Sequence, residues 1–303
     1  MMGMPDDARA VPRMGLAPGV TKAPPARRSL TDLGPRVVSA LILIALALAA
    51  AWLGGAGFAL FWLVAAASIL FEWQRMVAAP GTALRFGIGA TGLALVAWLV
   101  LTGATQEALA AIAIGAPVVG ALSVPGRRVW AAGGLVYAGA ILTAVLELRY
   151  SGPSVIGTDE LGLNAILWLF AVVWSHDVMA YFGGRLIGGP KLWPRISPSK
   201  TWAGTAMGIV SGAFAGAVMA PVPGSGVPCF ILGLLCALAA GAGDIFESAV
   251  KRRFGLKDSS HVIPGHGGVM DRLDGFAAAA VLAALVGVSR HGFGFAAVGL
   301  FYW

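Results

Sequence analysis

The chain has 303 residues, of which 58% are hydrophobic and only 12% charged, and its net charge is +7. A soluble domain carries about a quarter charged residues, and a soluble core of this size could not bury so much apolar surface. The composition therefore excludes an ordinary soluble domain and predicts an all-α polytopic membrane protein, in which a basic excess is typical of cytoplasmic loops and not of nucleic-acid binding.

Residues 1–35 are rich in proline and basic side chains and have no apolar periodicity, so we expect a disordered cytoplasmic tail. The segment is not a signal peptide, because its charged region is too long and no cleavage site follows a short apolar core. Attraction of Arg27, Arg28 and Arg36 to anionic lipid is the alternative to a simple solvated tail.

A helix that crosses a bilayer needs about 20 mostly apolar residues, with a lower limit near 17. Nine stretches are candidates: 37–53, 57–74, 86–102, 108–124, 129–147, 164–182, 202–220, 228–246 and 276–298. We expect about nine transmembrane helices, the first five in an amino-terminal region, 36–163, and the other four in a catalytic region, 164–303.

The distribution of Lys and Arg predicts the orientation. With the amino terminus in the cytoplasm, only Arg149 and Arg290 fall on the far side of the membrane. This asymmetry is typical of cytoplasmic loops, so we expect the two long polar loops, 183–201 and 247–275, to face the cytoplasm.

Ionisable residues near membrane depth are functional candidates, and three groups with helical spacing lie where an apolar stretch meets one of these loops. They are Asp177, Tyr181 and Arg185 on one helix face; Asp244, Glu247, Ser248 and Lys251 on a second; and Asp271 and Asp274, one turn apart.

Convergent carboxylates without His or Cys partners suit a hard cation such as Mg²⁺, which often bridges one or two protein carboxylates to substrate phosphates. The expected ligands are Asp244, Asp271 and Asp274, with the Ser248 hydroxyl completing the shell. A second cation is left open. The alternative is that these acids only pair with nearby Lys and Arg.

Basic side chains surround the acids. Phosphoryl and nucleotidyl transfer depends mainly on positioning and on neutralising phosphate charge, which suits such an arrangement. The candidates are Lys200, Lys251, Arg252, Lys257 and Arg272. Positive-inside charge and contact with lipid headgroups are the alternative.

The sequence IPGHGG, 263–268, adds backbone chemistry. Gly267 and Gly268 permit left-handed dihedrals and close approach, so their N–H groups are expected to bind an anion, and His266 to bond a phosphate or assist proton movement. A tight turn is the alternative.

The sequence ISPSKT, 196–201, supplies the hydroxyls of Ser197, Ser199 and Thr201 beside Lys200. It precedes an apolar stretch, so we expect Ser199 to cap the following helix while Thr201 or Lys200 reaches phosphate.

Together these residues resemble the signature of the phosphatidate cytidylyltransferase (CDP-diacylglycerol synthase) family. The matching residues, in order, are Ser248, Lys251-Arg252, Lys257-Asp258, Pro264-Gly265-His266-Gly267-Gly268 and Asp271-Arg272-Leu273-Asp274. Residues 177–202 resemble the family's second block. The chain departs from the family at two places. The family usually has Glu where this chain has Ala203, and where it has Gly-Lys after a conserved Arg this chain reads GGPK, residues 188–191.

The resemblance implies a multi-pass enzyme of the inner (plasma) membrane whose active site faces the cytoplasm. It implies that CTP and phosphatidate react to give CDP-diacylglycerol and pyrophosphate, with Mg²⁺ as cofactor. The expected catalytic residues are Asp244, Asp271, Asp274, Lys251, Lys257 and His266. The expected substrate-binding residues are Lys200, Ser197, Ser199, Thr201, Arg252, Arg272, Gly267, Gly268, Asp177, Tyr181 and Arg185.

Three other functions are alternatives. A transporter of an anionic substrate would place its charges near the bilayer midplane, whereas here they gather at one face. A CDP-alcohol phosphotransferase would carry an Asp-Gly-x-x-Ala-Arg pattern, which the chain lacks. A catalytically silent family member is the third, because of Ala203.

Two further patterns concern packing. Gly208, Gly212 and Gly216 repeat at every fourth residue, which permits close helix contact within one chain or, as the alternative, in a homodimer. Cys229 and Cys236 lie in an apolar run and are expected to be packing residues.

Overall fold

The structure, a computed structural model, describes residues 33–77, 79–150, 158–260 and 267–303. Its helices are α1 (Leu33–Leu53), α2 (Gly55–Val77), α3 (Thr82–Leu101), α4 (Thr105–Ala121), α5 (Arg128–Arg149), α6 (Thr158–Leu186), α7 (Trp202–Val218), α8 (Gly226–Arg253), α9 (Met270–His291) and α10 (Ala296–Phe301). The expected all-α architecture is confirmed, apart from a small hairpin of β1 (Lys191–Trp193) and β2 (Ser197–Thr201).

Each of the nine apolar stretches lies largely within one of the helices α1 to α9. Among the described residues, six helices are long and apolar enough to cross a membrane, namely α2, α3, α5, α6, α8 and α9. The apolar parts of α1, α4 and α7 are shorter, at the lower limit for a span. The fold is therefore that of a multi-pass membrane protein, and crossing by all nine helices stays a prediction.

The helices continue beyond the apolar stretches at the polar end. Helix α6 reaches Leu186, α8 reaches Arg253, and α9 begins at Met270. The connections are therefore shorter than the loops 183–201 and 247–275 that we expected. An apolar stretch predicts which residues lie inside the bilayer, but not where the helix ends. Lys and Arg are good helix formers, so a helix can continue past its apolar part into charged sequence.

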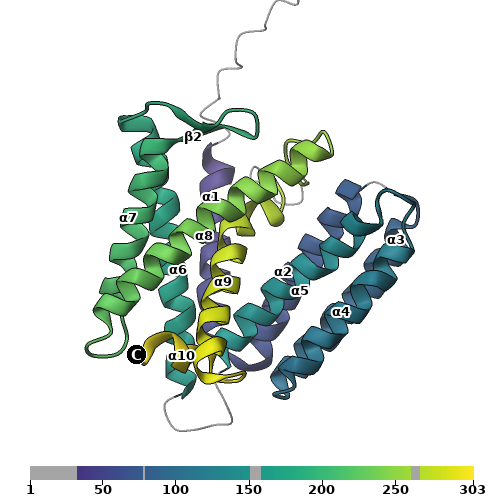
Figure 1. Ribbon diagram of the computed structural model, residues 1–303, viewed down its shortest axis with the longest axis horizontal. Coiled ribbons are helices and arrows are strands. Elements are labelled where there is room, and N and C mark those ends of the chain that lie inside the picture. Colours follow the sequence, from purple (N-terminus) through teal and green to yellow (C-terminus); the bar gives the residue numbers. More distant parts are fainter. Residues whose placement is uncertain (1–32, 78, 151–157, 261–266) are drawn as a thin grey trace, which may run out of the picture.

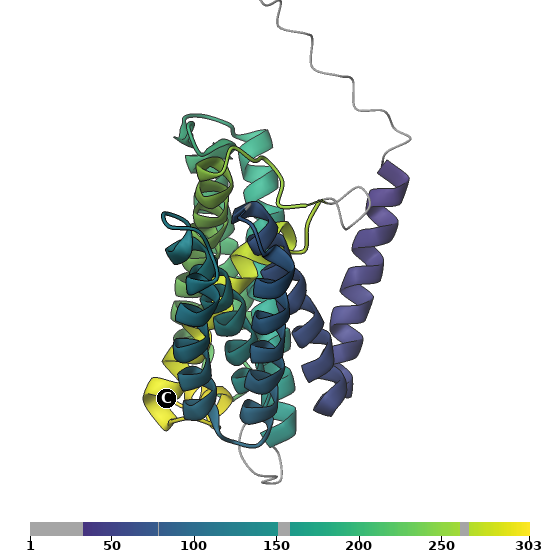
Figure 2. The ribbon, with the colours of Figure 1, turned by 90° about the vertical axis from the view of Figure 1, so that its right-hand side faces the viewer.

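Figure 1 shows α6, α7 and α8 on one side of the molecule, α2 to α5 on the other, and α9 between them. Figure 2 shows α1 along one edge, where it contacts α2 and α6. The hairpin and the carboxyl end of α8 lie at one end of the bundle in Figure 1, and α10 lies at the opposite end. The elements that carry the candidate residues therefore meet at one end.

Close packing between α6, α7 and α8 depends on small residues. A Cβ on Gly212 would lie 2.6 Å from the Cβ of Ala237, and one on Gly216 would lie 2.5 Å from the carbonyl oxygen of Cys229. Gly208 similarly approaches the backbone of His176. The expected intrachain use of this glycine pattern is confirmed, and so is the packing role of the two cysteines, which are free and buried.

Large apolar side chains cover much of the outer surface. Examples are Leu41 on α1, Ile114 on α4 and Val218 on α7, which are 60%, 70% and 82% exposed. Continuous apolar surface of this kind marks contact with lipid or with another apolar surface. Its spread over several helices agrees with a membrane protein.

Candidate active site

A polar cavity of about 1220 Å³ lies where α6, β2, α7, α8 and α9 meet. Sixteen of the candidate residues line it: Asp177, Tyr181, Arg185, Ser197, Ser199, Lys200, Thr201, Asp244, Glu247, Ser248, Lys251, Arg252, Lys257, Asp271, Arg272 and Asp274. Gly267 and Gly268 are not among the lining residues, and His266 lies outside the described part of the chain. The three helical groups therefore face a single space.

On the α6 wall, the expected stacking of side chains one turn apart is present. The guanidinium of Arg185 donates a hydrogen bond to the hydroxyl of Tyr181 across 3.2 Å. Asp177 lies one turn further along the same face, and its side chain is exposed to the cavity.

The hairpin brings Lys200 to α8. Its ammonium lies 2.5 Å from the carboxylate of Asp244 and 3.5 Å from the carbonyl oxygen of Gly241. This ion pair joins the end of β2 to the middle of the cavity wall.

The helix cap of α7 differs from our expectation. The side chain of Thr201, not that of Ser199, accepts a hydrogen bond from the N–H of Gly204, across 3.1 Å. Strand β2 keeps the backbone extended through Thr201, so Thr201 is the last residue before the helix and takes the cap position. Ser199 is exposed within the strand.

Lys251 is held between two carboxylates. Its ammonium lies 2.8 Å from Glu247 on the same helix and 2.7 Å from Asp271 on α9. All three side chains are at most 11% exposed, so this is a mostly buried ion-pair network that fastens α8 to α9.

Asp271 is also held by the backbone. Its carboxylate accepts hydrogen bonds from the N–H of Gly268 across 2.9 Å and from the N–H of Ser259 across 3.1 Å. The Gly268 N–H is thus buried against Asp271, and its expected binding of a substrate phosphate stays a prediction. Gly267 has the expected left-handed backbone, with a φ of 86°.

The expected group of Asp244, Asp271 and Asp274 does not form a ready metal cage. Within the described ranges, no three His, Cys, Asp or Glu side chains are arranged so that they could hold an ion. Asp271 is occupied by Lys251 and two backbone amides, whereas Asp274 lies within electrostatic reach of Asp244 and Asp177. Two cavity-facing carboxylates that repel each other suit a cation whose remaining ligands come from phosphate.

Sequence reasoning missed Glu72, a 1% exposed residue near the end of α2. Its carboxylate accepts four hydrogen bonds from the far end of the chain, donated by the hydroxyls of Ser259 and Ser260 and the N–H groups of Val269 and Met270. The available signal was an acidic residue inside the apolar stretch 57–74, which is costly unless it has partners.

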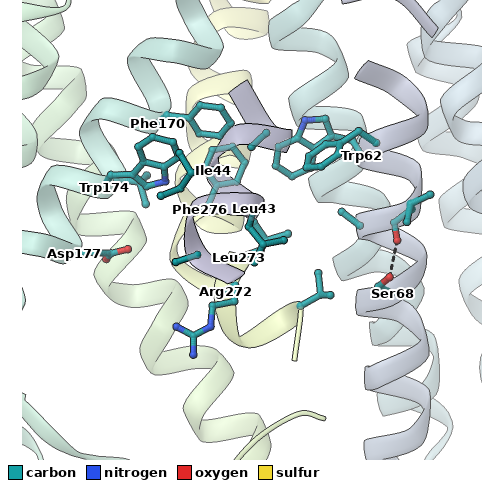
Figure 3. Close-up of a pocket in the computed structure, with 17 residues that line it drawn as sticks. Leu43, Ile44, Trp62, Ser68, Phe170, Trp174, Asp177, Arg272, Leu273 and Phe276 are labelled. Atoms are coloured by element: carbon teal, nitrogen blue, oxygen red, sulfur yellow. Dashed lines mark hydrogen bonds between the residues drawn. The ribbon is translucent and has the colours of Figure 1, made fainter. Parts of the chain in front are cut away.

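A second cavity, of about 360 Å³, lies between α1, α2, α6 and α9. Figure 3 shows its aromatic side chains, with Phe170 and Trp174 on one side, Trp62 on the other and Phe276 between them. The rings stack in pairs: Trp62 lies 5.1 Å from Phe276, and Phe170 lies 4.9 Å from Trp174.

The two cavities adjoin. Trp174, Asp177 and Arg272 line both of them, and Figure 3 shows Asp177 and Arg272 at the polar end of the apolar cavity. A charged chamber thus opens beside an apolar chamber in the same end of the bundle.

This arrangement defines the class: a multi-pass, helical membrane protein with a phosphate-suited polar cavity beside an apolar one. The family model described as "Cytidylyltransferase family" matches residues 34–289, and the chain belongs to this family of nucleotidyltransferase enzymes.

Similar proteins bear a common name. The phosphatidate cytidylyltransferase of Brucella abortus strain 2308 is 39% identical over 269 residues, which cover 85% of this chain and 94% of that protein. That of Rickettsia bellii is 42% identical over 118 residues, 36% of this chain and 51% of that protein. That of Rickettsia typhi is 38% identical over 128 residues, 39% of this chain and 56% of that protein.

Proposed function

We propose that this chain converts CTP and phosphatidate to CDP-diacylglycerol and pyrophosphate. The carrying observation is the junction of the two cavities at Trp174, Asp177 and Arg272. The reaction needs a triphosphate from water and a phosphate that carries acyl chains. A polar and an apolar chamber that share a wall offer each reactant a suitable environment.

In the proposed step, a phosphate oxygen of phosphatidate attacks the α-phosphorus of CTP. A new P–O bond forms as the bond between the α-phosphorus and the bridging oxygen breaks, and pyrophosphate leaves with that electron pair. The attacking phosphate is already anionic near neutral pH, so the site needs no strong general base. Its task is positioning and charge neutralisation.

The basic residues divide by environment. Arg252 and Lys257 are exposed on the cavity wall, where they suit the triphosphate and the leaving pyrophosphate. Arg272, which faces both chambers, suits the phosphate of the lipid. Lys251 is held by two carboxylates and suits a fixed positive charge beside the reacting groups.

Mg²⁺, when bound at this site, would supply charge neutralisation. Asp244 and Asp274, with the Ser248 hydroxyl, are the residues suited to hold it, because they face the cavity and the two acids repel each other in its absence. Asp271 is reassigned from metal ligand to anchor of Lys251 and of the segment before α9. Binding of a second cation at this site stays a prediction.

The rival functions receive no support from a specific contact. The charged candidate residues line one cavity, whereas a transporter would have them along a path through the bilayer. The hypothesis of a catalytically silent family member depends on Ala203. This residue lies in the first turn of α7 and is not one of the described residues that line the cavity.

We further propose that the cavity faces the cytoplasm from the inner membrane, with the amino terminus on the same side. The basic residues of both polar connections support this orientation. The bilayer is then the source of one substrate. A homodimer stays a prediction, since the glycine pattern on α7 is used within the chain.

The test is the purified protein with radiolabelled CTP, phosphatidate and Mg²⁺. The expected result is label in a lipid-soluble product only when phosphatidate is present. Absence of such a product from folded protein would overturn the proposal, and nucleotide-independent binding of an anion would favour transport.

A variant tests the apolar chamber in the same assay. Ala65 of α2 lines it, so Ala65→Phe fills part of the space. The KM for phosphatidate should rise about tenfold while that for CTP stays within about twofold. Ala113→Phe, at an exposed position of α4, is the matched control. Equal effects on the KM values for both substrates would show that this cavity does not bind phosphatidate.

A further inference from the structure

Glu72 is not among the residues that line the polar cavity, yet it accepts four hydrogen bonds from Ser259, Ser260 and the start of α9, the helix that carries Asp271 and Asp274. Each carboxylate oxygen accepts two donors. One accepts from the hydroxyl of Ser260 and the N–H of Val269, at 2.7 and 2.8 Å. The other accepts from the hydroxyl of Ser259 and the N–H of Met270, both at 2.9 Å. Both oxygens of this buried acid are thereby paired.

Two of these donors are helix-end amides. Val269 is the residue before α9, and Met270 is its first residue. The first N–H groups of a helix have no acceptor within the helix, and a negative charge there is also favoured by the helix dipole. Glu72 therefore caps α9 from another helix, across nearly two hundred residues of sequence.

Ser259 connects this cap to Asp271. Its hydroxyl donates to Glu72, while its N–H donates to Asp271. Gly268 fits between them, since a Cβ there would lie 1.9 Å from the Ser259 hydroxyl and 2.6 Å from the Glu72 carboxylate. Glu72 and Asp271 thus both bond to Ser259 and both lie against Gly268.

Asp271 in turn holds Lys251 at 2.7 Å, and Asp274 follows one turn later on α9. A small rotation of the first turn of α9 would move both acids and Arg272 relative to α8. Misplacement by about 1 Å can lower a rate by about a hundredfold.

We propose that Glu72 is a positioning residue for the cytidylyl transfer: it fixes the first turn of α9 so that Asp271 and Asp274 meet Lys251 and the substrates in reactive geometry. This inference rests on the proposed function. It assigns a role in the reaction to a residue of the amino-terminal helices, outside the carboxy-terminal motif.

The test compares two buried acids. Glu72→Gln keeps the size of the side chain but places an amide NH₂ against a backbone N–H, of Val269 or of Met270, that cannot accept a hydrogen bond. Glu147→Gln is the matched control: Glu147 is 3% exposed and accepts from Thr105 and from the N–H of Gly294, on elements that do not line the polar cavity. Both changes remove one buried charge.

For Glu72→Gln we expect kcat to fall about a hundredfold, with the KM values for CTP and phosphatidate within about threefold of wild type. Glu147→Gln should keep the wild-type kcat in its folded fraction. In an Asp271→Asn background, Glu72→Gln should add little further loss, because the two act on one segment. Hydrogen exchange at Val269 and Met270 should accelerate only in Glu72→Gln.

The outcomes separate the two proposals. An inactive wild type would overturn the proposed function itself. An active wild type in which Glu72→Gln and Glu147→Gln behave alike, or in which Glu72→Gln and Asp271→Asn losses multiply, would overturn the positioning role alone. If Glu72→Gln does not fold, Ser259→Ala and Ser260→Ala each remove one donor and should lower kcat more than KM; unchanged kcat in both would also overturn it.

Discussion

Lys251 occupies a gap between Glu247 and Asp271 that no other described cation enters. Removing a charge from a mostly buried ion-pair network leaves its partners uncompensated, which costs more than the pair itself contributes. The residue is thus expected to matter for stability as well as for turnover.

We predict that Lys251→Met destabilises the folded protein by about 3–5 kcal/mol, because two buried carboxylates lose their shared partner. Lys257→Met is the control, since Lys257 is exposed on the same cavity. Thermal unfolding in detergent measures both. Equal melting temperatures for the two variants would contradict a structural role for the buried ammonium.

At this scale, spacing predicted the cavity-facing groups because a helix places residues three and four apart on one face. The same reasoning missed Glu72, whose donors come from Ser259, Ser260 and the start of α9. It also did not predict that the Gly268 N–H bonds to Asp271, because this contact depends on the geometry of the turn and not on composition.

At the scale of elements, α7 and α8 lie close because glycine faces glycine. A Cβ on Gly233 of α8 would lie 2.7 Å from the carbonyl oxygen of Gly212 of α7. The contact holds the hairpin, which leads directly into α7, against the wall that carries Asp244.

We predict opposite signs for two glycine substitutions in helix interiors. Gly92→Ala in α3, where an added Cβ meets nothing within 4 Å, should stabilise the protein by up to about 1 kcal/mol through helix propensity. Gly233→Ala should lower the melting temperature and the turnover, because it separates α7 from α8. A neutral Gly233→Ala would show that the two helices can separate without cost.

The helices were predictable from apolar stretches, but their polar ends were not, because α6 and α8 continue into charged sequence. The hairpin of β1 and β2 was missed entirely. It is short, contains Pro198, and pairs with an irregular register, so it lacks the alternation that reveals longer strands.

At the scale of the whole molecule, composition alone predicted a membrane protein, since so much apolar surface cannot be buried in one soluble core. The number of crossings was not decided by composition, because the apolar parts of α1, α4 and α7 lie at the length limit. The orientation rests on charge asymmetry and is open to direct measurement.

We predict that a single cysteine at Arg195, on the hairpin, reacts with a membrane-impermeant maleimide in inverted membrane vesicles and not in intact spheroplasts. A cysteine at Thr102, after α3, should react in the opposite preparation. Both positions are exposed, and the natural cysteines are buried. Labelling of both positions from the same side would refute the proposed orientation.

The hydrogen bonds that Glu72 of α2 accepts from the start of α9 limit how the chain can be divided into fragments. A fragment beginning at α6 would keep every residue of the recognisable motif, yet two amides at the head of α9 and two serine hydroxyls would lose their acceptor. The signature is enough to recognise the family, but the carboxy-terminal part that carries it is structurally incomplete without Glu72. A split or grafted protein must therefore include the end of α2.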